Sequence, residues 1–425
     1  MKKNILIIGD GAREHALGWK LRQSEQIGDI YFSPGNAGTV NVGINIEVFP
    51  TDFKALVTFV KEKNVDLTIV GSEELLEKGI VDYFQKKKLL IFGPTKKSAQ
   101  IETSKAWASQ FMYKYAIPEA ESYSFTSYEK ALEFSKKEHR LFVVKASGLA
   151  SGKGVIVPQS KEEEFKAIEE VMVQKKFGDA GSSIVLQELL QGVEVSLLAF
   201  CDGKNIVPML PAQDHKRIFD FDQGPNTGGM GTYTPLPFVN EDMLTSLRQT
   251  ILQPFIYGMY KEGHPYKGVI FAGIMLTKDG PKVLEFNARF GDPETESLML
   301  MLDTELHPIL EACAQGTLEE SLVRFKSGSA CCVVLASSGY PSPTVSGEII
   351  HGLNNVYDSE VKLFYAGAVE TDGEIVANGG RAMVVAGYGE TIKEALEKVY
   401  NSIGEKGVHF SGMQYRRDIA WQSLK

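Results

Sequence analysis

The first 103 residues alternate short apolar runs that read as strands with segments that have the apolar periodicity of helices. The strands are expected at 4–8, 29–32, 67–70 and 89–92, and the helices at 13–23, 53–63 and 79–87. Strands that alternate with helices form a parallel α/β sheet, whose ligands bind at the loops beyond the carboxyl ends of the strands. This alternation therefore predicts both a fold class and the place of a ligand.

Three loops at residues 9–15, 34–39 and 71–74 follow such strands. The first lacks the last glycine of a dinucleotide-binding fingerprint because Glu14 stands there, and the second strand ends without an acid for a ribose hydroxyl. The pattern argues against NAD. A helix N-terminus with free N–H groups still suits a single phosphate, which Arg13 could reinforce.

A glycine-rich loop with a lysine near each end lies between two strand-like runs, in the sequence Lys145-Ala-Ser-Gly148-Leu-Ala-Ser-Gly152-Lys153-Gly154-Val155. Its glycines let backbone N–H groups approach phosphate oxygens, and the lysines can neutralise phosphate charge. A P-loop would open a helix, whereas β-branched residues follow this loop. We expect a β-hairpin that covers a triphosphate; the alternative is a glycine turn with incidental lysines.

Glu285 and Asn287 lie two positions apart on a predicted strand at 283–287, so their side chains project to one face. Carboxylate and amide oxygens suit Mg²⁺, which commonly bridges nucleotide phosphates. Arg289 could continue that face toward a transferring phosphate. Alone, this pattern favours ordinary surface residues; together with the glycine-rich loop it indicates an ATP-consuming enzyme.

A strand at 183–186 precedes Glu188 and Leu190, and Glu194 follows. Backbone groups at 188–190 could bind the edge of adenine, while the Glu194 carboxylate accepts hydrogen bonds from ribose hydroxyls.

The loop at 213–231 is polar, rich in glycine and too long for a plain connection, which is typical of functional loops. His215 could serve there as a general base or as a positioned polar group. Asp214 is the better candidate to receive a substrate ammonium group.

The length of 425 residues suggests roughly three domains. Changes in pattern place them at 1–103, at 104–326 with an embedded lid subdomain at about 123–190, and at 327–425, where an α+β unit is expected. The net charge of −9 argues against nucleic acid or an anionic membrane as a partner, and small phosphorylated substrates fit it.

The first apolar run is too short for a signal peptide, and no segment approaches the length of a membrane span. The four cysteines form no C-x-x-C pair, which indicates reduced, mostly buried thiols, and the histidines lack zinc-ligand spacing. We therefore expect a cytoplasmic protein, as a monomer or a weak dimer.

Taken together, the motifs resemble those of the glycinamide ribonucleotide synthetases (phosphoribosylamine–glycine ligases), ATP-grasp enzymes of de novo purine synthesis. The likeness runs from Ile5 to Ile419. Besides the glycine-rich loop, the motifs that carry it are Gly9-x-Gly-x-Arg-Glu-His15, Pro34-Gly-Asn-Ala-Gly38, Ile91-Phe-Gly-Pro94, Gln213-Asp-His-Lys-Arg217, Gly224-Pro-Asn-Thr-Gly-Gly-Met-Gly231, Glu285-Phe-Asn-x-Arg-Phe-Gly-Asp-Pro-Glu294, Asn378-Gly-Gly-Arg381 and Tyr415-Arg-x-Asp-Ile419.

The resemblance implies ligation of glycine to 5-phosphoribosylamine at the expense of ATP, through glycyl phosphate, to give glycinamide ribonucleotide, ADP and phosphate. It implies an ATP-grasp domain at 104–326 between an N-terminal α/β substrate-binding domain and the C-terminal domain. It also implies ATP as co-substrate, with Mg²⁺ or Mn²⁺.

The same resemblance implies roles for individual residues. ATP phosphates would be held by Lys105 and Lys145 and covered by Gly148, Ser151, Gly152, Lys153, Gly154 and Val155; adenosine would contact Glu188, Leu190 and Glu194; and the metal would bind Glu285 and Asn287. Arg289 would face the acyl phosphate, which makes Arg289, Asp214 and Lys145 the catalytic candidates. Glycine would lie near Asp214, Asp292, Pro293 and Glu294, and other substrate contacts would come from Gly11, Arg13, Glu14, Asn36, Gly38, Glu73, Asn226 and Gly229.

The chain departs from the usual family pattern at Ser72, where proline is common, and at Ser147, where aspartate is common. Neither change removes an implied ligand. Two rival functions remain: another ATP-grasp ligase or carboxylase of nucleotide or carboxylate metabolism, and a catalytically silent nucleotide-binding regulator. The first would lack the loop at 224–231, and the second would lack the metal ligands.

Overall fold

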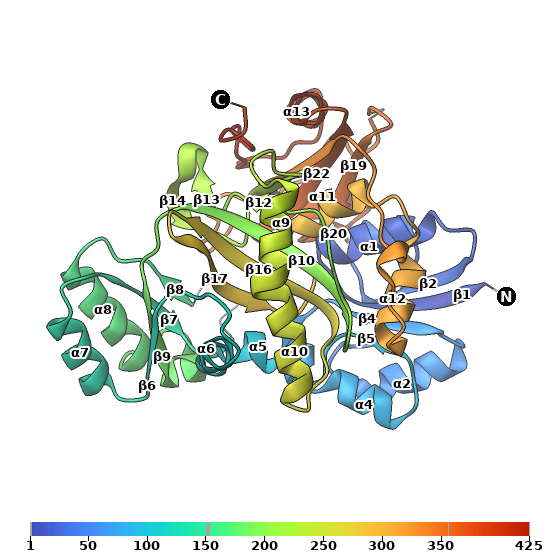
Figure 1. Cartoon of the computed structure of the whole chain (residues 1–425). Helices are drawn as coiled ribbons and strands as arrows, with labels where there is room; N and C mark the ends of the chain where they lie inside the picture. Colours follow the sequence, from blue (N-terminus) through green and yellow to red (C-terminus); the bar gives the residue numbers. More distant parts are fainter. Residues whose placement is uncertain (1, 150–153, 356, 425) are drawn as a thin grey trace.

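The computed structural model describes residues 2–149, 154–355 and 357–424. Four sheets of four or five strands account for most of the fold, with two small hairpins beside them (Figure 1). None of the helices in these ranges is long and apolar enough to cross a membrane.

The N-terminal sheet is parallel, as predicted, with the strand order β3-β2-β1-β4-β5. Its strands are β1 (Lys3–Gly9), β2 (Ile27–Pro34), β3 (Ile44–Asn45), β4 (Leu67–Val70) and β5 (Ile91–Phe92), and its helices are α1 (Ala12–Arg22), α2 (Phe53–Glu62), α3 (Glu73–Glu77) and α4 (Ile80–Lys86). β3 and α3 were not predicted. The segment 71–74 is thus only partly a loop, because two glutamates suited to a helix N-terminus begin α3.

The glycine-rich loop belongs to an antiparallel sheet with the order β6-β9-β7-β8. The strands are β6 (Ser122–Phe125), β7 (Phe142–Ala146), β8 (Val155–Ile156) and β9 (Ile184–Glu188), and α7 (Tyr128–Lys137) and α8 (Lys161–Met172) pack on them (Figure 1). Lys145 in β7 pairs with Val155 in β8, which confirms the predicted hairpin. Ser151, Gly152 and Lys153 lie outside the described residues.

The central sheet is antiparallel, in the order β11-β10-β16-β17. The strands are β10 (Val193–Asp202), β11 (Ile206–Pro208), β16 (Lys267–Thr277) and β17 (Gly280–Asn287). The helices around it are α5 (Gln100–Thr103), α6 (Lys105–Lys114), α9 (Glu241–Leu247), α10 (Gln253–Lys261), α11 (Glu294–Met301) and α12 (Leu306–Gln315). Phe255 and Met259 of α10 share one buried apolar cluster with Leu197 and Ile270 of the sheet.

The C-terminal sheet takes two strands from the 213–231 region, in the order β12-β15-β18-β22-β19. The strands are β12 (Gln213–Asp214), β15 (Gly231–Thr234), β18 (Ser329–Ala336), β19 (Val361–Tyr365) and β22 (Arg381–Gly389), with α13 (Ile392–Asn401) against them. β19 is followed by β20 (Ala368–Thr371), which forms a hairpin with β21 (Glu374–Ala377). Both ends of the 213–231 loop are therefore anchored in one sheet, and β13 (Arg217–Phe219) and β14 (Gln223–Asn226) form a hairpin between them.

The four cysteines are free and buried, as predicted from the sequence. Burial raises the pKa of each thiol, which keeps it protonated and inert.

Candidate functional site

The carboxylate of Glu285 in β17 is surrounded by cationic side chains. Burial alone would raise the pKa of Glu285, but Lys145, Lys216 and Lys105 outweigh that effect and lower it. Lys145 is held in place by a hydrogen bond from Nζ to the carbonyl oxygen of Leu284 at 3.0 Å. Three ammonium groups near one carboxylate leave net positive charge, which suits a polyphosphate.

Lys145 and Lys216 differ in their surroundings. Burial lowers the pKa of Lys145 to about 8. Burial also opposes the charge on Lys216, but an ion pair with Glu194 and the nearby Glu285 raise its pKa above the ordinary value. Glu194 thus contacts a lysine in the structure, and its predicted hydrogen bond to ribose stays a prediction. Lys216 was not among the site residues predicted from the sequence.

The segment expected at the adenosine lies at the end of β9. Glu188 accepts a hydrogen bond from the backbone N–H of Glu121 at 3.3 Å and lies 3.1 Å from Lys282 Nζ. Leu190 is half-buried just beyond Glu188.

The described residues of the glycine-rich loop bond to neighbouring backbone. The backbone N–H of Gly148 donates to the carbonyl oxygen of Ala180 at 3.1 Å, and the hydroxyl of Ser147 accepts from the N–H of Ala106 at 3.2 Å. Gly154 is buried.

Glu285 and Asn287 offer a carboxylate and an amide oxygen from one strand. The lowered pKa of Glu285 keeps the carboxylate ionised, which fits a hard divalent cation. Within the described ranges no three His, Cys, Asp or Glu side chains cluster as metal ligands, so a cation at Glu285 would need phosphate or water oxygens to complete its shell.

Arg289 links this strand to two glutamates. Its guanidinium lies 3.4 Å from Glu73 Oε2 and 3.5 Å from Glu102 Oε1, and Nη2 also lies 3.4 Å from the Asn287 amide oxygen. Burial would raise the pKa of Glu73, but Arg289 and Arg13 together lower it. Burial raises the pKa of Glu102 to about 7, although its Oε2 accepts from the N–H of Ala288 at 2.6 Å. Glu102 was missed because nothing in its local sequence predicts that it packs under β17.

Glu14 is an internal support for the N-terminal loops. It is buried, accepts from the N–H of Gly11 at 2.8 Å and lies 2.6 Å from Arg13 Nε. A Cβ on Gly71 would stand 1.9 Å from Glu14 Oε1, so these loops close around the carboxylate. Arg13 also donates to the carbonyl oxygen of Phe290 at 3.2 Å, which brings it to the Arg289 end of β17.

Asn36 and Gly38 likewise hold the second loop in shape. The amide of Asn36 donates to the carbonyls of Asp10 and Tyr365, both at 2.7 Å, while its oxygen accepts from the N–H of Gly38 at 2.8 Å. A Cβ on Gly38 would lie 2.5 Å from the Tyr365 ring. Asn36 and Gly38 therefore stabilise the shape of the loop, and direct contact of either residue with substrate stays a prediction.

A pair of buried carboxylates lies beside Lys216. Burial and the neighbouring Glu294 raise the pKa of Asp214 well above its ordinary value. Among the described residues, Asp214 Oδ1 has no hydrogen-bond partner, whereas Glu294 Oε1 accepts from the Ser196 hydroxyl at 2.9 Å. A Cβ on Gly229, whose φ is +115°, would lie 2.7 Å from Asp214 Oδ1. A small cation placed between these two acids would favour their ionised forms.

The segment 292–293 is held by Arg381. The guanidinium donates to the carbonyl oxygens of Gly228 and Asp292, both at 2.9 Å, and Nη2 lies 3.0 Å from Asp292 Oδ1. A Cβ on Gly229 would meet Pro293 at 2.5 Å. Asn226 is exposed in β14, whereas Gly229 is buried beside Asp214, so the structure does not group Asn226 with them.

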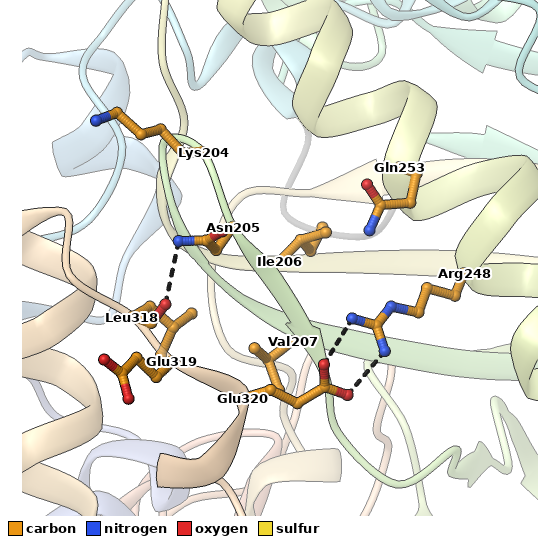
Figure 2. A pocket seen from close by; sticks show the side chains of 9 residues that line it. All are labelled: Lys204, Asn205, Ile206, Val207, Arg248, Gln253, Leu318, Glu319 and Glu320. Atoms are coloured by element: carbon orange, nitrogen blue, oxygen red, sulfur yellow. Dashed lines mark hydrogen bonds and ion pairs between the residues drawn. The ribbon is translucent and has the colours of Figure 1, made fainter.

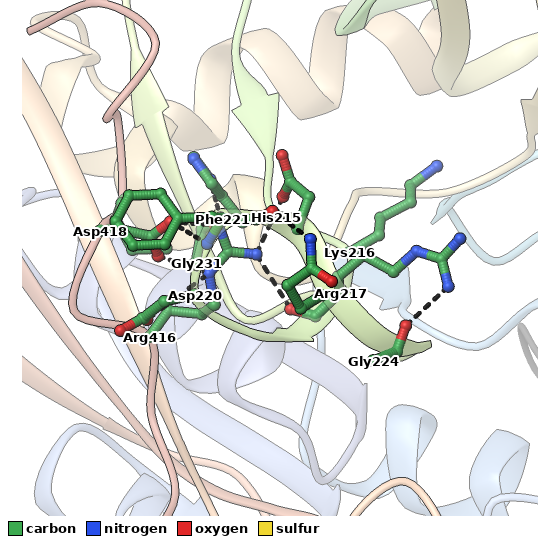
Figure 3. Close-up of polar contacts among 12 residues, drawn as sticks. His215, Lys216, Arg217, Asp220, Phe221, Gly224, Gly231, Arg416 and Asp418 are labelled. Carbon is green, nitrogen blue, oxygen red and sulfur yellow. Dashed lines mark hydrogen bonds and ion pairs between the residues drawn. The ribbon is translucent and has the colours of Figure 1, made fainter.

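His215 occupies the positioned role that was one of its two alternatives. Its ring is buried, with Nδ1 3.1 Å from the carbonyl oxygen of Gly231 (Figure 3). On the other side of the ring, Nε2 lies 3.1 Å from the backbone nitrogen of Ala420. Burial lowers the pKa of the imidazole, which keeps it neutral.

A cavity of about 370 Å³ opens elsewhere, between β11, Arg248 and residues 318–320 (Figure 2). Arg248 crosses it to pair with Glu320 at 2.7 Å. No residue predicted for the site lines this cavity.

Comparison with known proteins covers nearly the whole chain. The N domain, ATP-grasp (A) domain and C domain of phosphoribosylglycinamide synthetase match residues 3–102, 103–295 and 330–422. The phosphoribosylamine–glycine ligase of Vibrio parahaemolyticus is 42% identical over 99% of this chain and 98% of its own length. The trifunctional purine biosynthetic protein adenosine-3 of Gallus gallus is 44% identical over all of this chain, which spans only 42% of that relative.

Solved structures agree with these sequence matches. The crystal structure of the phosphoribosylamine–glycine ligase from Thermotoga maritima has a TM-score of 0.85 at 34% identity, over 98% of this chain and all of that one. A biotin carboxylase from Campylobacter jejuni has a TM-score of 0.72 at 15% identity, over 98% of this chain and 93% of that one, which shows the shared fold alone. These matches confirm the predicted ATP-grasp fold class.

Proposed function

Because this chain belongs to the phosphoribosylglycinamide synthetase family, we propose that it joins glycine to 5-phosphoribosylamine with hydrolysis of ATP to ADP and phosphate, in purine biosynthesis. The membership argues against the rival carboxylase, whose solved relatives share the fold at low identity. The trifunctional relatives are much longer than this chain, and the proposal concerns the ligase reaction alone.

One observation carries the proposal: Lys216 lies between a phosphate-binding and an ammonium-binding environment. Its charge lowers the pKa of Glu285, inside the lysine cluster, and also opposes the raised pKa values of the buried acids Asp214 and Glu294. A ligand with an anionic group toward the lysines and a cationic group toward the acids would match both. Glycine, with a carboxylate and an ammonium group attached to the same carbon, is such a ligand.

The proposed chemistry has two steps. A glycine carboxylate oxygen attacks the γ-phosphorus, the bond to the β-γ bridging oxygen breaks, and ADP leaves. The amine of phosphoribosylamine then attacks the acyl carbon of glycyl phosphate, loses a proton, and expels inorganic phosphate. Phosphorylation is needed because a carboxylate oxygen is a poor leaving group, and catalysis is mostly positioning and charge neutralisation.

The candidate site residues fall into groups according to the charge of the ligand that each would bind. Lys145, Lys105 and Lys216 would bind phosphate oxygens, and the Arg289 guanidinium would stabilise charge on the transferring phosphoryl group. Glu285 and Asn287 would hold Mg²⁺ or Mn²⁺, which supplies further neutralisation of the phosphates when bound. Asp214 and Glu294 would accept the glycine ammonium group, and a cation there would restore their ionised forms.

The N-terminal loops would bind phosphoribosylamine. The N-terminus of α1 offers free N–H groups for its phosphate, with Arg13 close by. Glu14 and Asn36 would act by holding these loops, as their hydrogen bonds indicate.

The direct test is ADP release by the purified protein with Mg-ATP and phosphoribosylamine generated in the assay. We expect release that requires both substrates, prefers glycine to alanine, and falls by about a hundredfold or more in Glu285→Ala. Turnover without phosphoribosylamine, or with bicarbonate in place of glycine, would assign the chain to another ATP-grasp reaction. ATP binding with no turnover would favour the silent regulator.

A further inference from the structure

The motif Tyr415-Arg-x-Asp-Ile419 has no part in the chemistry proposed above, yet it contains a fully buried arginine. Arg416 is 0% exposed, and its side chain lies against the hairpin formed by β13 and β14 (Figure 3). A guanidinium without solvent needs several acceptors to offset its lost hydration. Those acceptors identify what Arg416 holds together.

Arg416 joins the C-terminal segment, defined as residues 415–423, to the 213–231 loop. Its guanidinium donates to both carboxylate oxygens of Asp418, at 2.5 and 2.8 Å. Nη1 reaches across to the loop, donating to Asp222 Oδ1 at 2.9 Å and to the carbonyl oxygen of Arg217 at 3.1 Å. This geometry needs arginine, because its four hydrogen bonds, two of them a bidentate pair with Asp418, exceed the three donors of an ammonium group.

A second contact between the same two segments holds a strained turn. Phe221 and Asp222 both have a φ of 56°, a left-handed backbone that costs such residues roughly 1 kcal/mol or more each. The N–H of Phe221 donates to Asp418 Oδ2 at 2.6 Å, and the Phe221 ring packs edge-on against Trp421 at 5.9 Å. The turn thus keeps its shape through the C-terminal segment.

A third contact leads to the candidate glycine site. His215 stands between Asp214 and Lys216 in the chain, and its Nε2 accepts from the N–H of Ala420 while Nδ1–H donates to Gly231. The backbone of His215 also pairs with Gly231 and Met230. The position of the two neighbouring side chains therefore depends on the C-terminal segment.

We propose that Arg416 is a positioning residue for glycine: by fixing the 213–231 loop through Asp418 and Asp222, it sets Asp214 and Lys216 at the distance that a glycine zwitterion requires. Arg416 touches no substrate itself. The inference rests on the proposed ligase function, and it assigns to the last residues of the chain a role in amino-acid affinity rather than in ATP binding.

The test measures KM for glycine and KM for ATP in Arg416→Lys and Asp222→Asn, with Arg417→Lys as matched control. Arg417 is exposed and adjacent, and its side chain lies over the Tyr415 ring, while its backbone N–H donates to Asp220 of the loop, a contact that the substitution keeps. We expect KM for glycine to rise about tenfold in both test variants, with KM for ATP within about twofold of wild type, because only the loop shifts. The control should match wild type in both constants.

Three results would overturn the inference. The first is a glycine KM in folded test variants equal to that of Arg417→Lys. The second is an equal rise of both KM values, which would mean a general structural role. If Arg416→Lys fails to fold, the glycine KM of Asp222→Asn alone decides the test. The Asp222 side chain is 42% exposed, so the folded protein should tolerate this substitution. The third result is wild-type protein without glycine-dependent turnover, which would overturn the proposed function and this inference together.

Discussion

The guanidinium of Arg289 lies 3.4 Å from the carboxylate of Glu73, although the two residues are 216 positions apart. The contact joins the end of β17 to the first residue of α3, and so connects the lysine-lined nucleotide region with the N-terminal loops. Glu102, 3.5 Å from the same guanidinium, completes the support. In the proposed reaction, Arg289 would lie where both substrates meet.

Arg289→Lys should lower kcat about a hundredfold, with a smaller effect on KM for ATP, because an ammonium group cannot replace a planar guanidinium at a charge-developing phosphoryl group. Steady-state kinetics at saturating glycine measures this. Glu73→Gln serves as the comparison: it leaves the guanidinium in place and should cost no more than about tenfold. A lysine variant with full kcat would remove Arg289 from the chemistry.

ATP binding should weaken as pH rises through 8, because burial lowers the pKa of Lys145 to about 8 and only its ammonium form attracts phosphate. Between pH 7 and pH 9 the protonated fraction falls about tenfold, and Kd should rise by the same factor. Calorimetric titration with a non-hydrolysable ATP analogue at constant ionic strength measures this. In Lys145→Met, binding should be weaker at pH 7 and nearly independent of pH; a wild-type Kd that stays constant over this range would contradict the assignment.

Glu102 should make the protein less stable as pH rises from 4.5 to 7. Burial raises its pKa from 4.5 to about 7 in the folded state, so in this window the folded chain holds a proton that the unfolded chain has released. Linkage then predicts a loss on the order of 3 kcal/mol across the window.

Glu102→Gln imitates the protonated acid and should lack this loss. Urea denaturation should therefore show the variant gaining stability relative to wild type between pH 5 and pH 8. If the difference in unfolding free energy between Glu102→Gln and wild type were the same at pH 5 and pH 8, Glu102 would be ionised in the folded protein at both pH values.

Gly71→Ala should destabilise the N-terminal loops, because the added Cβ would lie 1.9 Å from the buried carboxylate of Glu14. We expect a loss of about 2 kcal/mol in unfolding free energy, with weaker binding of phosphoribosylamine. The neighbouring residue Ser72 precedes α3, and its side chain makes no hydrogen bond that caps the helix. The unfolding free energy of Ser72→Ala should therefore stay within about 0.5 kcal/mol of wild type. Equal stability of the two variants would show that Glu14 can move aside at no cost.

Elements with a strong local signal were predictable from the sequence. The strand at 67–70 is β4 residue for residue, and the hairpin around the glycine-rich loop follows from β-branched residues after Gly154. Local reasoning also placed Glu285 and Asn287 on one strand, since alternation along a strand is a local property.

The contacts between distant segments were not predictable in the same way. Glu102, Lys216 and Arg381 become site residues only because the fold brings three separate segments to β17 and Asp292. Glu14 and Asn36 were predicted to contact substrate because they are polar residues in glycine-containing loops; their hydrogen bonds in the structure are to the protein itself, and the substrate contact stays a prediction. Glu164 of α8 is a further example, since it is fully buried and accepts from the N–H of Phe142 at 2.9 Å, a contact between two separate segments.

The most direct test of the proposed reaction follows the oxygen atoms of glycine. With both carboxylate oxygens labelled with ¹⁸O, activation through glycyl phosphate must transfer one labelled oxygen to inorganic phosphate in each turnover. Mass spectrometry of the phosphate formed with ATP and phosphoribosylamine should therefore show one ¹⁸O per molecule. Unlabelled phosphate, formed while glycinamide ribonucleotide accumulates, would mean that the carboxylate never attacks ATP.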